Sequence, residues 1–195
     1  AEDTRHSRNL LNFYNIKKPI ISYHQHSKRS KLQEIKRHLI SGKKIALICD
    51  AGTPGISDPA GKLVRYLSKE IPKIKITPIP GPSALIAALS VSGFPANQFL
   101  FAGFPPAKRK RKRFFKEALK YPGTIVIFES PHRLRKSLDA LAEEMKTQRQ
   151  QREIFLIKEI SKRFEKCWRG EVTEVFGLLK EKKLQGEFVI VLSPI

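Results

Sequence analysis

The chain has 195 residues and carries 38 Lys and Arg against 18 Asp and Glu, a formal net charge of +20 at pH 7. Its 41% hydrophobic residues suffice for a core, which excludes a wholly disordered chain. This charge favours a polyanionic partner, nucleic acid first and an anionic membrane surface second. No apolar run approaches the roughly 20 residues of a membrane-spanning helix. Cys49 and Cys167 lack the spacing of a disulfide framework or a zinc site, which favours a cytoplasmic protein with reduced thiols.

The first half of the chain alternates short apolar runs with helical patterns. A strand over 19–23 precedes a helix that has Ser30 and Gln33 at capping-box spacing and ends before Gly42. Further expected elements are a strand over 44–49, a short helix carrying Leu63, Val64 and Leu67, a strand over 74–79, and an Ala/Leu-rich helix ending near Gly93. This alternation predicts right-handed βαβ units and a mostly parallel sheet.

The second half begins with a candidate linker at 103–107, which is rich in Gly and Pro. It divides the chain into two expected α/β lobes, 1–103 and 104–195, with a cleft between them. The elements expected after it are a basic helix, a strand over 124–128, a helix that starts at Ser130 and Pro131 and buries Leu134, Leu138, Leu141 and Met145, strands over 154–157 and 164–168, a helix marked by Val172, Val175, Phe176 and Leu179, and a strand over 188–192.

Gly- and Pro-rich loops next to the expected strands are the candidate ligand site. They cover residues 50–59, 80–84, 129–133, 158–163 and 186–187. Glycine lets a ligand approach the backbone closely, so such loops favour binding through main-chain hydrogen bonds. Nucleotide and dinucleotide phosphate motifs are missing. Only His24 and His26 have a metal-like spacing, and without a third ligand we predict no metal.

Several short motifs occur in an order that resembles a known family. They are Glu-Asp-Thr-Arg at 2–5, Asp-Ala-Gly-Thr-Pro-Gly-Ile-Ser-Asp-Pro at 50–59, Pro-Gly-Pro-Ser-Ala at 80–84, Gly-Phe-Pro at 93–95 and 103–105, Glu-Ser-Pro-His-Arg at 129–133 and Gly-Glu-Phe at 186–188. Together they resemble the tetrapyrrole methylase superfamily over essentially the whole chain. Within it they are most similar to the branch that methylates the ribose 2'-hydroxyl of a cytidine in the decoding region of small-subunit ribosomal RNA.

The resemblance implies a two-lobed class III methyltransferase in which each lobe is a mostly parallel or mixed sheet flanked by helices. It also implies S-adenosylmethionine (SAM) as methyl donor in the interlobe cleft, a homodimer, and ribosomal RNA or the assembled small subunit as partner. Members begin with a further strand and loop, so we expect a segment ahead of Ala1. The cofactor-binding residues that the resemblance implies are Ala51, Gly52, Thr53, Ser83, Ala84, Glu129, Ile160, Gly186, Glu187 and Phe188.

A ribose hydroxyl is a poor nucleophile and benefits from a positioned base or a polarising cation. The candidates for that role are Asp3, Glu129, Lys158 and Glu159. Arg5 and Arg133 are available to hold a phosphate. Residues Lys108, Arg109, Lys110, Arg111, Lys112 and Arg113 form an unbroken basic run, which predicts a ridge that contacts RNA phosphates. The alternative for each charge is a solvated surface or an ion pair.

Two other functions fit the sequence. One is SAM-dependent methylation of a tetrapyrrole or another small molecule, and the other is a basic RNA-binding module without catalysis. An exposed ridge of six cations suits RNA better than a porphyrinoid, which needs a few cations inside a pocket. We therefore expect an RNA ribose methyltransferase. SAM binding without RNA affinity would instead favour the small-molecule acceptor, and RNA binding without SAM binding would favour the module.

Overall fold

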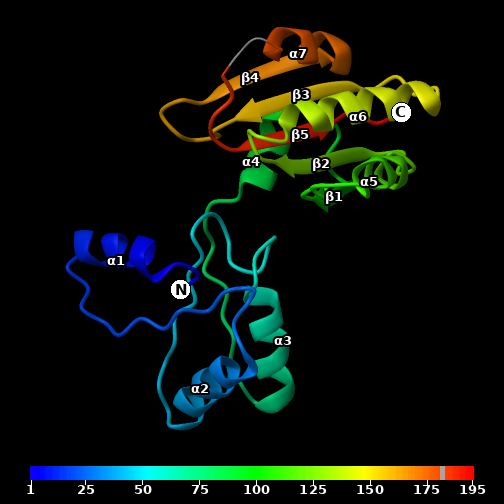
Figure 1. Cartoon of the computed structure of the whole chain (residues 1–195). Helices are drawn as coiled ribbons and strands as arrows, with labels where there is room; N and C mark the ends of the chain where they lie inside the picture. The colour runs from blue at the N-terminus through cyan, green and yellow to red at the C-terminus, as the bar shows by residue number, and fades with distance from the viewer. Residues whose placement is uncertain (181–182) are drawn as a thin grey trace. The chain divides into compact units, whose positions relative to one another are not determined.

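A computed structural model describes residues 1–180 and 183–195 (Figure 1). The chain forms two compact units, Ala1–Ser83 and Ala84–Ile195. The division lies between Ser83 and Ala84, whereas the sequence analysis places the lobe boundary after residue 103. The reason is β1 (Phe99–Gly103), which pairs with β2 (Thr124–Glu129) and so belongs to the sheet of the second unit. The expected linker at 103–107 accordingly lies inside that unit.

The second unit is built on one five-stranded sheet. Its strand order is β1-β2-β5-β3-β4, where β3 is Glu153–Lys158, β4 is Lys166–Glu171 and β5 is Phe188–Leu192. Only β1 and β2 run parallel, and the other neighbours pair antiparallel. The sheet is therefore mixed, which confirms the second of the two arrangements, mostly parallel or mixed, that the resemblance implies. Its central strands are apolar on both faces, a pattern that burial imposes whatever the strand direction.

Helices cover both faces of this sheet, as Figure 1 shows. One face packs against α5 (Arg111–Ala118), α6 (Leu134–Thr147) and α7 (Val172–Leu179) in a core that includes Ile127, Leu156 and Ile190. The opposite face packs against α4 (Ala84–Ser92) through residues such as Val126, Phe155 and Val191. The alternation of these residues along each strand follows the two-residue period of the pleat. The four α6 residues predicted to be buried are confirmed as core.

Some predicted helix starts are wrong. Helix α6 begins at Leu134 and not at Ser130, because a turn closed by hydrogen bonds from Arg133 and Leu134 to the Ser130 carbonyl precedes it. Helix α2 (Arg29–Ile40) begins at Arg29 with Lys28 as N-cap, so the capping box expected from Ser30 and Gln33 does not form. No helix in the described part of the chain is long and apolar enough to cross a membrane.

The secondary structure of the first unit consists of helices. It contains α1 (Thr4–Phe13), α2 and α3 (Ala60–Glu70), and a small core around Tyr23, Ile35, Leu63 and Leu67. The strands predicted over 19–23, 44–49 and 74–79 are not formed, and residues 1–83 contain no strand. A strand exists only through its pairing partners, and these three segments share no ladder within the unit. Apolar, β-branched composition alone does not supply a partner.

One buried arginine holds together the end of the sheet at which β2 and β3 begin and β5 ends. Arg152 is 3% exposed, and burial lowers its pKa, although a guanidinium stays charged in proteins. It donates hydrogen bonds to the carbonyl groups of Leu119, Tyr121, Gly123 and Ser193 and to the side chain of Gln150. This one side chain therefore joins the segment before β2 to the end of β5.

We expect Arg152→Ala to lower the free energy of unfolding by about 3 kcal/mol, because the substitution leaves buried carbonyl groups without the charged hydrogen-bond donor that they have in the native protein. Chemical denaturation of the variant measures this loss. Arg113→Ala is the matched control, since Arg113 is exposed on α5, and it should change stability by less than about 0.5 kcal/mol. Equal effects of the two substitutions would contradict the assigned role.

Candidate functional site

Two of the predicted ligand loops meet within the first unit. Thr53 Oγ1 donates to the Pro82 carbonyl at 3.0 Å, which links loop 50–59 to loop 80–84. Asp58 holds the first loop in shape, because its carboxylate accepts hydrogen bonds from the backbone of Gly55 and of Ala60 at the start of α3. Gly52 and Gly55 adopt positive φ angles of 71° and 96°. The loop thus keeps a fixed, sharply turned path that glycine allows.

The backbone at the start of this loop is open to solvent. Ala51 and Gly52 are exposed, while Cys49 lies behind them with its thiol donating to their carbonyl groups at 3.1 and 3.3 Å. Burial is the main cause that raises the pKa of the Cys49 thiol, so it remains a protonated donor at neutral pH. Ser83 and Ala84, the other predicted donor-site residues of this part of the chain, are half-buried.

In the second unit, three strand ends meet at one edge of the sheet. Glu129 at the end of β2 pairs with Phe188 at the start of β5, and Phe188 pairs with Lys158 at the end of β3. Residues opposite each other in antiparallel strands project from the same face. The register therefore places these three predicted site residues side by side, although they are far apart in the sequence. Ile160 lies just beyond β3 and packs on the α4 side of the sheet.

A polar clasp fastens the loops at this edge. The Glu159 amide donates to the Glu187 carbonyl, the Glu187 amide donates to Glu159 Oε1, and both distances are 2.8 Å. Lys162 bridges the carboxylates of Glu159 and Glu187 at 3.1 and 2.9 Å. The hydrogen bond from the Glu187 backbone, followed by that from Lys162, lowers the pKa of Glu159. Glu159 therefore serves to hold Gly186 and Glu187 in place.

The carboxylate of Glu129 also holds a loop through hydrogen bonds. Its side chain is 1% exposed, and its two carboxylate oxygens accept hydrogen bonds from the Ser130 amide at 2.7 Å and from the Ser137 hydroxyl. The carboxylate thus anchors the turn ahead of α6 and faces the helix, away from solvent. Sequence reasoning missed Ser137 and Lys162, because nothing in the local pattern pairs either residue with a carboxylate of a predicted loop.

Asp3 and Arg5 form an ion pair in the first unit. Arg5 Nη2 lies 2.8 Å from Asp3 Oδ2, and the Asp3 carboxylate also caps α1 by accepting from the Arg5 amide. The Arg5 side chain is the main cause that holds the pKa of Asp3 well below its usual range. A carboxylate with so low a pKa is a weak base, so the geometry favours capping over proton transfer.

Five of the six cations in the basic run are exposed, and one of these five forms an ion pair. Lys108, Arg109, Lys110 and Arg113 are exposed. Arg111 is buried and donates to the carbonyl groups of Pro106 and Ala107, so it is not part of the exposed ridge that the sequence predicted. Lys112 is exposed but pairs with Glu143 at 2.7 Å. Arg133, the other predicted phosphate contact, is exposed immediately before α6.

The described residues contain no group of three or more His, Cys, Asp or Glu side chains arranged to hold a metal ion. The rings of His24 and His26 lie 6.2 Å apart at the surface.

Comparison with known proteins decides the family. The family model described as tetrapyrrole (corrin/porphyrin) methylases matches residues 2–175. The chain belongs to this family. A ribosomal RNA small subunit methyltransferase I from Thermotoga maritima is 42% identical over 193 residues, which covers 99% of this chain and 84% of that protein. Its counterpart from Bacillus subtilis is 40% identical over 196 residues, and the chain spans 64% of that protein's length.

Solved structures agree on the fold. A uroporphyrin-III C-methyltransferase from Thermus thermophilus, complexed with S-adenosylhomocysteine, superposes with a TM-score of 0.56 at 16% identity. The superposition covers 88% of this chain and 75% of that chain. These findings confirm the predicted family and the α/β fold of the class III methyltransferases, with SAM as methyl donor.

The residues present fit an adenosylated amino acid as ligand. Such a molecule offers amine, carboxylate, ribose hydroxyl and adenine groups, which neutral backbone donors and acceptors can bind without a dedicated cation or metal. The exposed backbone of Ala51 and Gly52, and the backbone of Gly186 and Glu187 held by the clasp, are groups of this kind.

We expect Gly186→Ala to destabilise the protein by about 2 kcal/mol, because Gly186 has a φ of 85° and an added Cβ would lie 2.6 Å from Glu159 Cδ. The clasp must then open, so affinity for S-adenosylhomocysteine, measured by calorimetry, should fall as well. Gly177→Ala is the control, since that helical glycine has nothing within 4 Å of an added Cβ. It should stabilise the protein slightly and leave affinity unchanged. Unaltered affinity in Gly186→Ala would contradict the placement of this turn at the donor site.

Proposed function

We propose that this chain is a SAM-dependent RNA methyltransferase that methylates the ribose 2'-hydroxyl of a cytidine in the decoding region of small-subunit ribosomal RNA. The observation that carries the proposal is the 42% identity, over nearly the whole chain, to a protein named for methylation of that RNA. The net charge of +20 and the exposed cations before and on α5 suit a polyanionic acceptor. No observation on the described residues favours a tetrapyrrole over RNA.

The donor site in this proposal uses the backbone of Ala51, Gly52 and Thr53, together with Ser83, Ala84, Ile160 and the turn Gly186, Glu187 and Phe188. SAM supplies an activated methyl group when bound. The chain contributes orientation, because displacement at a sulfonium methyl requires acceptor, methyl carbon and sulfur in line. Loops fixed by Asp58 and by the Glu159–Glu187 clasp provide that rigidity.

Lys158 is the residue we propose as catalytic. It stands at the end of β3 beside Phe188 and Glu129, and it is half-buried. An ammonium there can hold the acceptor oxygen by a hydrogen bond and stabilise negative charge as the hydroxyl loses its proton. Glu129 and Asp3, the other predicted catalytic residues, act in this proposal as positioning groups, since their carboxylates already serve the α6 turn and the α1 cap.

RNA affinity in this proposal comes from Lys108, Arg109, Lys110, Lys112 and Arg113, with Arg5 and Arg133 as additional phosphate contacts. We also propose that the protein acts in the cytoplasm as a homodimer on ribosomal RNA or on the assembled small subunit.

The test of the function is methyl transfer from labelled SAM to small ribosomal subunits that lack the modification, followed by mapping of ribose methyl groups. We expect one 2'-O-methylcytidine in the decoding region. Labelling of a base, or of no RNA despite SAM binding by calorimetry, would overturn the proposal. In the second case the acceptor is a small molecule.

We expect Lys158→Ala to reduce kcat by about 100-fold or more, the lower range for loss of a group that assists proton transfer. Affinity for SAM should stay within twofold, because the lysine acts on the acceptor. Lys166→Ala is the matched control, as Lys166 lies directly opposite Lys158 on β4 and is exposed. Comparable kcat values for the two variants in single-turnover assays would show that Lys158 has no such role.

A further inference from the structure

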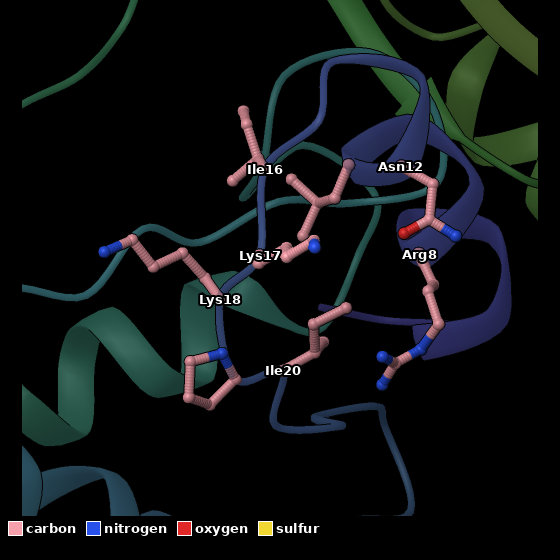
Figure 2. Close-up of a pocket in the computed structure, with 8 residues that line it drawn as sticks. Arg8, Asn12, Ile16, Lys17, Lys18 and Ile20 are labelled. Atoms are coloured by element: carbon pink, nitrogen blue, oxygen red, sulfur yellow. The ribbon is translucent and has the colours of Figure 1, made fainter.

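A hollow of about 230 Å³ lies beside α1 in the first unit, outside every predicted site (Figure 2). Its shape follows from the way α1 ends. The Ile16 amide donates to the Leu11 carbonyl at 2.8 Å, the Asn15 amide donates to the Asn12 carbonyl at 3.0 Å, and Asn15 has a φ of 55°. This is a Schellman motif, which turns the chain back along the helix and sets Ile16 near Leu11.

The lining of the hollow combines positive charge with an apolar wall. Arg8 and Asn12 stand four residues apart on α1, hence on one face of the helix, and Figure 2 shows them across from the returning segment that carries Lys17. Lys18 is also at the rim, and the apolar wall comes from Leu11, Ile16, Pro19 and Ile20. Cations and an amide beside an aliphatic surface match a nucleotide, which joins an anionic phosphate to a flat base whose faces pack on apolar surfaces.

The surrounding sequence has no negative charge to compete with such a ligand. From Thr4 to Gln33 the chain contains seven Lys or Arg and no Asp or Glu. The cations at the hollow, Arg8, Lys17 and Lys18, are all exposed. A one-signed stretch of this kind raises the local concentration of a polyanion.

An aromatic pair follows directly at the end of α1. Phe13 is 78% exposed and Tyr14 is 63% exposed, and their rings meet edge to face with centroids 5.1 Å apart. Exposed aromatic rings next to phosphate-binding cations are the usual platform for unstacked bases of single-stranded RNA. The apolar rings and the cationic hollow thus point to the same ligand independently.

We propose that the end of α1 and the segment 13–20 form a second RNA contact, which holds an unpaired nucleotide of the substrate. A backbone phosphate binds in the hollow at Arg8 and Lys17, and a neighbouring base stacks on Phe13 or Tyr14. The inference rests on the proposed function, because it assigns to the RNA substrate a contact apart from the donor site and the basic run.

The test uses a fluorescein-labelled single-stranded RNA 12-mer of mixed sequence, with anisotropy recorded from 50 to 300 mM salt. We expect Arg8→Ala/Lys17→Ala to weaken binding at least tenfold and to reduce the slope of log affinity against log salt by about 0.7, the value for one lost phosphate contact on a single strand. Phe13→Ala should weaken binding without changing the slope. Lys62→Ala/Arg65→Ala is the charge-matched control, as both residues are exposed on α3.

SAM affinity and methyl transfer to small ribosomal subunits are measured for the same variants. Unchanged 12-mer affinity and slope in Arg8→Ala/Lys17→Ala, with wild-type methyl transfer intact, would overturn this inference and leave the proposed function standing. A wild-type chain that neither binds the 12-mer nor methylates RNA overturns both. If Phe13→Ala instead dissociates a dimer in sedimentation and binds RNA normally, the aromatic pair is a protein interface and the inference fails.

Discussion

The pairing of β5 between β2 and β3 is the constraint on which the rest of the second unit depends. Phe188 stands opposite both Glu129 and Lys158, so a single register brings three distant segments to one sheet edge. A slip by one residue would exchange the side chains that face α5, α6 and α7 with those that face α4, and it would bring Glu187 inward. Both faces of β5 are buried, with Phe188, Ile190 and Leu192 in one core and Val189 and Val191 in the other, so the packing of different side chains on the two faces holds the register. The core and the candidate site therefore share one structural cause.

Acidic residues in both units hold loops in place. Glu129 fixes the turn ahead of α6, Glu159 fixes Glu187, and Asp58 in the first unit fixes the start of α3. Each carboxylate bonds backbone amides that a loop would otherwise leave to solvent. The loops thereby keep main-chain polar groups in fixed positions, and Lys158 stands at the same sheet edge as Glu129. This division suits methyl transfer from a sulfonium, in which alignment contributes much of the rate.

The sequence predicted most of the second unit, because its strands and helices carry strong apolar patterns, as in β5 and in the Leu134–Met145 stripe of α6. It did not predict the strand directions, since antiparallel and parallel strands with two buried faces have the same composition. The strands expected in the first unit failed because pairing depends on partners that a single segment does not specify. Arg111 shows the same limit at the site: composition does not show that this one cation of the run, at the start of α5, is buried and bonds the carbonyl groups of Pro106 and Ala107. The motifs identified the ligand loops, whereas the Ser137 and Lys162 contacts depend on tertiary structure.

The central proposal is that loops from separate parts of the chain bind the methyl donor: residues 51–53, and the segments 158–163 and 186–188, whose strands pair in the register of β5. Hydrogen exchange of the chain with and without S-adenosylhomocysteine, resolved by peptide, tests it most directly. We expect slower exchange in residues 51–53 and in the segments 158–163 and 186–188, with no change in the basic segment 108–113. Protection confined to other segments, or uniform protection of the whole chain, would contradict it.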